Sequence, residues 1–427
     1  MNISIRKTSL GDDVCRGILN RAKEDLSSAR DAVWPILEDV RKNGDSAVRK
    51  YTEKFDGIVL SSFAVKPSEV KTEISSAEKK AFEKAKENIW NFHELQKPVN
   101  REKTVDGNRL GIRYTPIERL AVYAPGGTAL YPSSVLMGVI PAKIAGVREV
   151  NLFTPPSKNG LHPSLVFVAE MLGVDNIFTV GGAQAVAAAG YGTESIPKAD
   201  FIVGPGNKYV AAAKGVLAGL GQIGIESIAG PSEVFIIADE TANPEWIACD
   251  MLSQAEHGED SVAVLATTSA ELAERVKSEL SRAAVQRPKR LEMKRKAIEN
   301  NSHILIFPSM EQCIDFSNQY APEHLEIQTK DYNSVFEKIL HAGSVFLGPY
   351  SPVAVGDYIS GTNHILPTAG LARISSSLGV DSFLKRVTYQ EVTKDSLMNL
   401  YPHVDLMSRI EGLDEEHGTS VKLRTLS

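Results

Sequence analysis

Residues 120–205 contain four short apolar runs, which are LAVYAP (120–125), EVNLFT (149–154), NIFTV (176–180) and FIVGP (201–205). The runs begin at residues 120, 149, 176 and 201, so each start lies 25 to 29 residues after the one before. That spacing is the length of one strand, one turn and one helix. The pattern predicts an α/β fold in which a parallel sheet is covered by helices on both faces.

A second series of apolar runs follows toward the C-terminus: VFIIAD (234–239), SVAVLAT (261–267), HILIFP (303–308), HLEIQT (324–329) and SVFLGP (344–349). Helical patterns at residues 244–258 and 269–283 separate some of these runs. The two series together predict two adjacent α/β domains, each built on a sheet of about five strands.

The segments at the two ends of the chain have a different character. Residues 31–55 and 80–96 place apolar side chains at three- and four-residue steps, which is typical of helices, and Asp106-Gly107 indicates a hairpin turn between short strands. We expect residues 1–122 and 234–378 to form one α/β domain and residues 123–233 a second. Residues 379–427 are expected to form a small, partly helical C-terminal element.

Composition narrows the class of protein. Of the 427 residues, 43% are hydrophobic and 23% charged, and the net charge of −6 makes nucleic acid an unlikely partner. No apolar run is long enough to cross a membrane, and the N-terminus lacks the pattern of a signal peptide. Three widely spaced cysteines, Cys15, Cys249 and Cys313, favour a reducing compartment. We therefore expect a cytoplasmic protein.

The segment MLSQAEHG (251–258) carries a candidate metal-binding pair. Gln254 and His257 are three residues apart at the end of a predicted helix and so share one face of it. Imidazole is a common zinc ligand, and an amide can supply an oxygen. A histidine near a helix C-terminus followed by Gly258 is also an ordinary helix stop, so the pair alone does not establish a metal site.

Glu323 and His324, in the sequence APEHL, place an acid beside a base at the start of a predicted strand. Such a pair can transfer protons near neutral pH. Ligands usually bind at the carboxyl ends of parallel strands, however, and this pair lies at the opposite end. A solvated pair in a loop is the alternative interpretation.

Three further features suggest chemistry without establishing it. The long polar loop at 355–364 contains Asp357, which could ligate a metal through oxygen or cap a turn. Glycine-rich turns at 125–127, 181–182 and 204–206 could bind phosphate, although no GxGxxG or Walker pattern is present. Glu411 and His417 lie in the tail, where nothing in the local sequence distinguishes them from exposed residues.

Eight motifs, taken together, resemble the histidinol dehydrogenase family. They are VYAPGGTALYPSSVLM (122–137), VGGAQAVAAAGYGT (180–193), VGPGNKYV (203–210), IAGPSEV (228–234), SQAEHG (253–258), YAPEHLEI (320–327), GDYISGTNHILPT (356–368) and EGL with a later His (411–417). Each motif is modest alone, but eight in family order make the resemblance highly specific. It is weakest over the first hundred residues.

The resemblance implies a four-electron oxidation of L-histidinol to L-histidine through an aldehyde, with two NAD⁺ consumed. It implies a zinc ion, held by Gln254, His257, Asp357 and His417, that orients the substrate through its imidazole and amine. His324 would accept the alcohol proton as hydride leaves, and Glu323 would help to activate water for the second oxidation. A Cys nucleophile is disfavoured, because no motif contains a cysteine.

The resemblance also implies further contacts and an assembly. Ser232 and Glu411 match substrate contacts, together with the four zinc ligands and His324, and His364 is a further candidate. Tyr123, Gln184 and Asn207 match NAD contacts. The implied fold has two incomplete Rossmann-like domains in an intertwined homodimer. The C-terminal tail of one subunit would then supply Glu411 and His417 to the active site of the other.

The tail departs from the family pattern at one point. The family usually has Glu and His five residues apart, as EGLxxH, whereas here EGLDEEH separates them by six. We interpret this as one inserted residue and favour His417 as the ligand, with Glu416 as the alternative.

Three other functions fit parts of this pattern. A sibling zinc and NAD dehydrogenase could oxidise another small polar alcohol, such as a sulfonated diol. A zinc hydrolase could use Glu323 as the base on metal-bound water, and a non-catalytic scaffold could retain the same residues. Formation of NADH would distinguish a dehydrogenase from the hydrolase and the scaffold. The alcohol that is oxidised would distinguish a histidinol dehydrogenase from the sibling enzyme.

Overall fold

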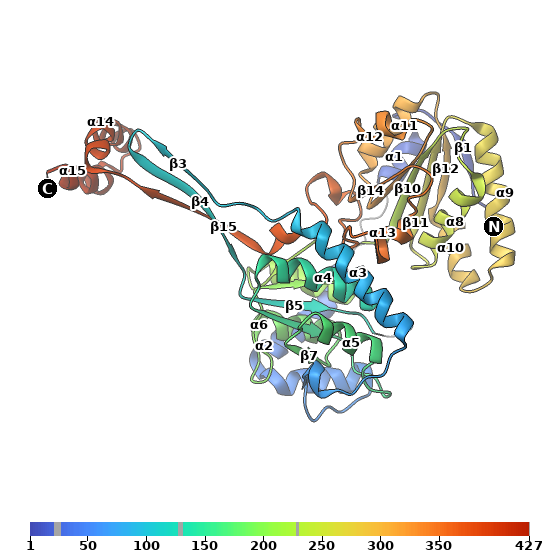
Figure 1. Cartoon of the computed structure of the whole chain (residues 1–427), viewed down its shortest axis with the longest axis horizontal. Coiled ribbons are helices and arrows are strands. Elements are labelled where there is room, and N and C mark those ends of the chain that lie inside the picture. Colours follow the sequence, from blue (N-terminus) through green and yellow to red (C-terminus); the bar gives the residue numbers. More distant parts are fainter. Residues whose placement is uncertain (21–26, 127–130, 228–229, 427) are drawn as a thin grey trace.

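The computed structural model describes residues 1–20, 27–126, 131–227 and 230–426, and it consists of two α/β units and a long arm (Figure 1). Two sequence motifs extend beyond these ranges. Gly127 of the turn at 125–127, and Ile228 and Ala229 of the motif at 228–234, lie outside the described residues. No helix within the described ranges is long and apolar enough to cross a membrane.

The four runs of residues 120–205 lie in one sheet, here called sheet B, with the strand order β2-β7-β6-β5-β8-β9. Its strands are β2 (Ala64–Val65), β5 (Arg119–Tyr123), β6 (Glu149–Phe153), β7 (Asn176–Phe178), β8 (Phe201–Val203) and β9 (Gly224–Ile225). All neighbours pair in parallel except β2, which is antiparallel to β7 at the edge.

The second series of runs lies in sheet A, with the order β1-β12-β11-β10-β13-β14 and parallel pairing throughout. Its strands are β1 (Ile5–Lys7), β10 (Glu233–Ala238), β11 (Val262–Thr267), β12 (His303–Ile306), β13 (His324–Gln328) and β14 (Ser344–Leu347). Each sheet therefore has six strands where about five were predicted. The additional strands β1, β2 and β9 are only two or three residues long and leave no recognisable pattern.

Helices cover both faces of each sheet, as the continuous apolar runs require. In β5, Leu120 and Val122 pack with α4 (Pro132–Ala145) and α5 (Pro163–Met171), and the intervening Ala121 packs on the other face with α2 (Ser27–Asp56), α6 (Gly182–Tyr191) and α7 (Lys208–Gly219). In β10, Ile236 faces α8 (Pro244–Ala255), α9 (Ala270–Gln286) and α10 (Leu291–Asn301), and Ile237 faces α1 (Asp13–Leu19), α11 (Met310–Tyr320) and α12 (Tyr332–Phe336). The predicted fold class is confirmed.

The N-terminal helices contact sheet B and its helices. Helix α2 packs against α6 and α7, and α3 (Ser76–Glu94) packs against α4. Strand β1 and helix α1, by contrast, join the unit built on sheet A. On these contacts we propose that residues 27–122 belong with 123–227, and not with residues 234–378 as the sequence analysis assigned them.

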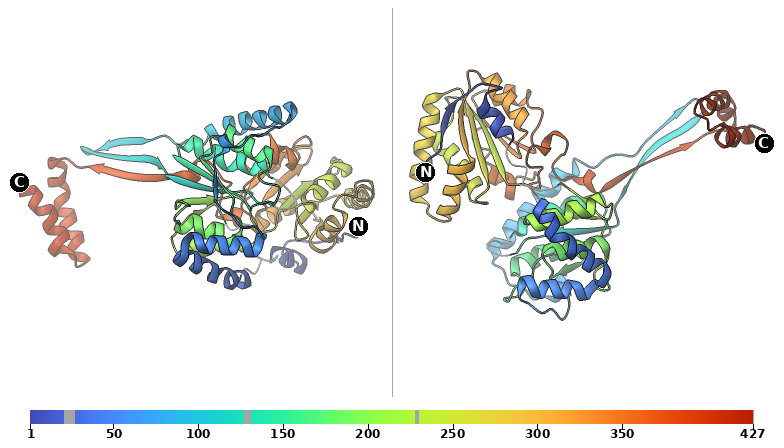
Figure 2. Two further views of the ribbon diagram at one scale, coloured as in Figure 1. Left: turned by 90° about the horizontal axis from the view of Figure 1, so that it is seen from below. Right: turned by 180° about the vertical axis from the view of Figure 1, so that it is seen from behind.

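The arm is a three-stranded antiparallel ribbon that extends away from both units (Figures 1 and 2). It consists of β3 (Arg101–Val105), β4 (Asn108–Pro116) and β15 (Leu384–Glu391), in the order β15-β4-β3. Asp106 and Gly107 both have positive φ angles, 49° and 80°, and form the predicted hairpin turn. Beyond the ribbon lie α14 (Lys394–Ile410), a single π-helical turn η4 (Asp414–Gly418) and α15 (Thr419–Leu426), here called the tail.

Candidate active site

A cavity of about 440 Å³ lies between the two units. On one side it is lined by residues at the amino-terminal ends of strands of sheet A, among them Ser232 before β10 and Glu323 before β13. On the other side it is lined by Gly126 and Gly206, in the turns that follow β5 and β8 of sheet B. Larger grooves, between α2 and α7 and along the ribbon, contain none of the predicted site residues. The cavity therefore joins the amino edge of one sheet to the carboxyl edge of the other.

Glu323 and His324 line this cavity, and the backbone of Glu233 on the neighbouring strand β10 holds both side chains. The Glu233 N–H donates to Glu323 Oε2 at 2.7 Å, and the Glu233 carbonyl lies 2.9 Å from His324 Nδ1. Because a carbonyl can only accept, Nδ1 carries the proton of this hydrogen bond. The other ring nitrogen, Nε2, is buried, and the described part of the chain offers it no hydrogen-bond partner. In the neutral ring Nε2 is thus left as an acceptor.

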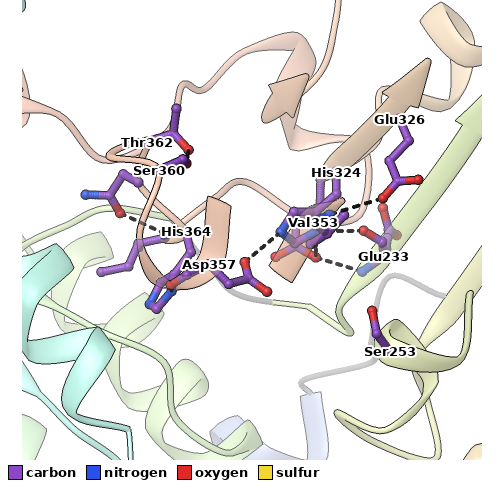
Figure 3. A network of polar contacts seen from close by, with 12 residues as sticks. Glu233, Ser253, His324, Glu326, Val353, Asp357, Ser360, Thr362 and His364 are labelled. Atoms are coloured by element: carbon purple, nitrogen blue, oxygen red, sulfur yellow. Dashed lines mark hydrogen bonds and ion pairs between the residues drawn. The ribbon is translucent and has the colours of Figure 1, made fainter. Parts of the chain in front are cut away.

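The charge on His324 is governed by two neighbouring carboxylates. Burial alone would lower the pKa of His324, but the negative charge of Glu323 and the interaction with Asp357 outweigh it and raise the pKa well above its ordinary value. Asp357 Oδ1 lies 3.6 Å from His324 Nε2. Burial would raise the pKa of Asp357, but His324 outweighs it and lowers that pKa. Asp357 is therefore a carboxylate aimed at the catalytic end of the ring (Figure 3).

Three of the four predicted zinc ligands face the same cavity. Gln254 and His257 come from the end of α8, and Asp357 comes from α13 (Val353–Tyr358). Gln254 is buried and His257 is exposed, with the His257 N–H donating to the Gln254 carbonyl at 3.2 Å. No three His, Cys, Asp or Glu side chains among the described residues gather closely enough to hold a metal by themselves. Two such residues and one amide form an incomplete set that needs a further ligand.

His364 and Ser232 complete this wall of the cavity. The His364 Nδ1 lies 2.8 Å from the Asp357 carbonyl, and its Nε2 lies 3.5 Å from the Ser134 hydroxyl. Burial lowers the pKa of His364, although the charge of Asp357 opposes this effect. The His364 ring therefore connects helix α13, which carries Asp357, to α4 of the opposite unit.

The three predicted NAD contacts lie at the carboxyl edge of sheet B. Tyr123 ends β5, and its hydroxyl accepts a hydrogen bond from the Gly182 N–H at 3.1 Å. Gln184 is in the first turn of α6, buried, with no partner for its Oε1. Asn207 caps α7, so its Oδ1 is occupied by the Tyr209 and Val210 N–H groups. None of these three residues lines the cavity itself, but the turns that follow β5 and β8 do.

Glu411 and His417 do not line the cavity; both are exposed in the tail at the far end of the ribbon. His417 lies in the π-helical turn η4, which holds one more residue per turn than an α-helix and is a common way to accommodate an insertion. This observation agrees with the extra residue inferred in EGLDEEH. It leaves His417 and Glu416 as alternative ligands.

Two acidic residues near the site, the buried Glu326 and the half-buried Asp250, were not identified from the sequence. Glu326, in the middle of β13, is fully buried and accepts the Val353 N–H, at the start of α13, at 3.1 Å. Burial raises the pKa of Asp250 on α8 to about 6, a rise that a hydrogen bond with Glu326 limits. Burial and the charge of Asp250 raise the pKa of Glu326 well above its ordinary value. The available signal was an acidic residue inside an apolar run, because such residues are rarely buried without a partner.

Comparisons with known proteins agree over nearly the whole chain. A family model described as histidinol dehydrogenase matches residues 19–425. A histidinol dehydrogenase from Leptospira biflexa is 67% identical over 407 residues, which are 95% of each chain. One from Methanocaldococcus jannaschii is 47% identical over 93% of this chain and 92% of its own. The crystal structure of a histidinol dehydrogenase from Elizabethkingia anophelis matches with a TM-score of 0.93 at 38% identity, covering 99% of this chain and 98% of that one.

Proposed function

The chain belongs to the histidinol dehydrogenase family, and we propose that its cavity oxidises L-histidinol to L-histidine with NAD⁺ as the oxidant and one zinc ion per subunit. The activity is that of an oxidoreductase of histidine biosynthesis. The observation that carries the assignment to this cavity is His324. Its Nδ1 is fixed by the Glu233 carbonyl, and its Nε2 is buried without a hydrogen-bond partner.

The proton chemistry follows from that arrangement. Oxidation of the alcohol to the aldehyde removes one hydride and one proton, and Nε2 of His324 can accept the proton when the ring is neutral. The charges of Glu323 and Asp357 favour the protonated ring, and zinc held by Asp357 would offset one of those charges and so favour the neutral form. The aldehyde must then take up water before a second hydride can leave as the acid forms. Glu323 is the carboxylate beside His324, and we assign it to activate that water. Both side chains are nearly buried, which limits the access of bulk solvent to the proton being transferred.

The residues around the cavity fit a zinc ion. Gln254, His257 and Asp357 supply one amide, one imidazole and one carboxylate from two elements that face the same space, and these donor types suit zinc. When bound, zinc would hold the substrate in one orientation relative to His324. The low pKa of Asp357 keeps it in the ionised form that a metal ligand needs.

The residues at the carboxyl edge of sheet B fit a dinucleotide. The turns after β5 and β8 border the cavity, and this edge is where ligands of parallel sheets bind. Gln184 has a buried oxygen without a partner, and Asn207 keeps its amide Nδ2 free of the helix cap. We assign these two residues, with Tyr123, to NAD⁺.

The missing ligand would come from a second copy of the chain. The tail carries Glu411 and His417 at the end of a ribbon that contacts neither sheet beyond its base (Figure 2). Its exposed apolar side chains include Leu406, Met407 and Ile410, which are 59%, 62% and 76% exposed. An apolar surface of this kind marks an interface. We propose a homodimer in which each tail completes the partner's zinc and substrate site.

The first test is NADH absorbance after zinc-loaded protein, L-histidinol and NAD⁺ are mixed, repeated with a chelator and after zinc is restored. Two NADH per histidinol, lost with the chelator and regained with zinc, is the expected result. No NADH from intact, metal-loaded protein would contradict the assigned substrate and favour a sibling alcohol, to be sought by screening small polar alcohols.

Free cysteines that are not paired with one another agree with a cytoplasmic location.

A further inference from the structure

A buried ion pair lies beside the glycine-rich turn that follows β8. Lys214 on α7 and Glu226 after β9 have side chains that are 5% and 10% exposed, and their closest atoms are 2.7 Å apart. The Lys214 ammonium donates to both carboxylate oxygens of Glu226, at 2.7 and 2.9 Å. Neither residue is among the predicted site residues, although Glu226 lines the cavity.

The pair holds Gly204 through both of its backbone polar groups. The Gly204 N–H donates to Glu226 Oε1 at 2.9 Å, and the Gly204 carbonyl accepts from Lys214 Nζ at 2.9 Å. The parallel ladder between β8 and β9 ends one residue before Glu226. The two side chains therefore take the place of backbone partners at the point where the sheet stops.

The conformation that they hold is available only to glycine. Gly204 has a φ of 113°, and a Cβ at this position would overlap the carbonyl oxygen of Tyr123. Directly after β8, the backbone of Gly204 thus lies very close to Tyr123, the last residue of β5. Three residues later the chain reaches Asn207, the cap of α7.

We propose that Lys214 and Glu226 are positioning residues for the dinucleotide, because they hold the Gly204 turn between Tyr123 and Asn207; this inference rests on the proposed use of NAD⁺. If either partner is removed, the other is left as an unpaired buried charge, and the turn loses one of its two side-chain hydrogen bonds. The position of Asn207 and the approach of the turn to Tyr123 would then relax. Binding of histidinol, which occurs at the amino edge of sheet A, should change little.

The test compares Lys214→Met and Glu226→Gln with wild type in steady-state assays that vary NAD⁺ and L-histidinol separately. In addition, NAD⁺ is titrated directly into each protein in a calorimeter, which gives its dissociation constant. The second variant retains an oxygen that can accept the Gly204 N–H and so protects the experiment against simple misfolding. Lys143→Met is the matched control, because it removes the lysine of a looser pair with Asp175, at 3.8 Å, elsewhere in the same unit.

The expected result is a KM and a dissociation constant for NAD⁺ that rise by roughly ten- to a hundredfold in Lys214→Met, the size of effect that small displacements of positioning groups produce. Glu226→Gln should show a smaller rise, whereas the KM for histidinol and the zinc content should stay within about twofold. A lower melting temperature with an unchanged KM for NAD⁺ would overturn the proposal and leave the pair a purely structural role. Absence of NAD⁺ reduction by the wild type would instead remove the proposed function itself.

Discussion

The shared active site can be tested by combining two inactive chains. His324→Ala removes the proposed base from the cavity, and His417→Ala removes the proposed ligand from the tail. Strands β4 and β15 of the ribbon pair over eight residues, so the ribbon extends for roughly 30 Å at about 3.4 Å per residue. The tail lies beyond that distance and does not line the cavity of its own chain. Each variant alone should therefore be inactive for a different reason, in a different part of the dimer.

Mixed dimers should recover activity in a defined proportion. When the two variants are co-expressed in equal amounts, about half of the dimers contain one chain of each kind, and one of their two sites combines an intact cavity with an intact tail. About a quarter of the wild-type activity should return. Co-expression of wild type with His324→Ala, as a control, should give about half, because only the cavities of the variant are lost.

The assay is NADH formation on the purified mixture, with affinity tags of two kinds to show that mixed dimers formed. If the tail served its own cavity, a mixed dimer would contain no intact site, and activity would stay at background. Background activity in a preparation proven to contain mixed dimers would therefore refute the exchange of tails. The exchange of tails would also be contradicted if the specific activity of the wild type stayed constant on dilution to concentrations at which the protein is a monomer.

The remaining predictions concern single positions. His324→Gln should lower kcat by roughly 10²- to 10⁴-fold, the contribution of a general base, while zinc content measured by atomic absorption is unchanged; loss of zinc would contradict the separation of base and ligands. His417→Ala should weaken zinc binding by more than about tenfold in a chelator competition, and Glu416→Ala should not; the reverse order would make Glu416 the ligand. Because burial raises the pKa of Asp250 to about 6 from its ordinary value of 3.8, its stabilising contribution is present below about pH 4 and is lost as the pH rises through about 6. Asp250→Asn should therefore raise the melting temperature relative to wild type more at pH 8 than at pH 5, and an equal change at both values would show that the carboxyl does not titrate as inferred.

The central strands could be predicted from the sequence because both of their faces are buried. Every residue of β10 and β13 is buried. In β10 the buried residues after Glu233 form a continuous apolar run, whereas β13 alternates buried polar and apolar residues, with Glu326 at its centre. The ribbon could be predicted only at its turn. All five residues of β3 are exposed, and β15 has seven exposed residues out of eight, so neither strand shows an apolar face within its own chain. If a second copy covers them, the information needed to predict them lies in the dimer.

The family resemblance named the candidate site residues one by one and implied a site shared between two chains, and these roles stay predictions; the local sequence did not indicate which of the residues lie together. Gln254 and His257 lie on one helix end, and nothing local indicates that Asp357, a hundred residues later, faces the same cavity. In the structure Asp357 lines the same cavity as Gln254 and His257. Burial alone would raise the pKa of Asp357, but the nearby His324, His364 and His257 lower it. For Glu411 and His417 neither the local sequence nor the single chain places them at the cavity, and their role stays a prediction until the dimer is tested.

The position of Glu323 and His324 at the amino end of β13 counted against them when only the sequence was considered, but in the structure this end of the strand lines the cavity. Ligands prefer the carboxyl edge of a parallel sheet because helix N-termini and unpaired N–H groups gather there. The carboxyl edge of sheet B is such an edge and is where we propose that the dinucleotide binds. The amino edge of sheet A supplies something different: the ladder between β10 and β13 begins at Val234 and His324, so the N–H and carbonyl of Glu233 lie just before it. These two groups are the ones that hold Glu323 Oε2 and His324 Nδ1. A strand end that presents one backbone donor and one backbone acceptor to neighbouring side chains can thus orient an acid and a base together.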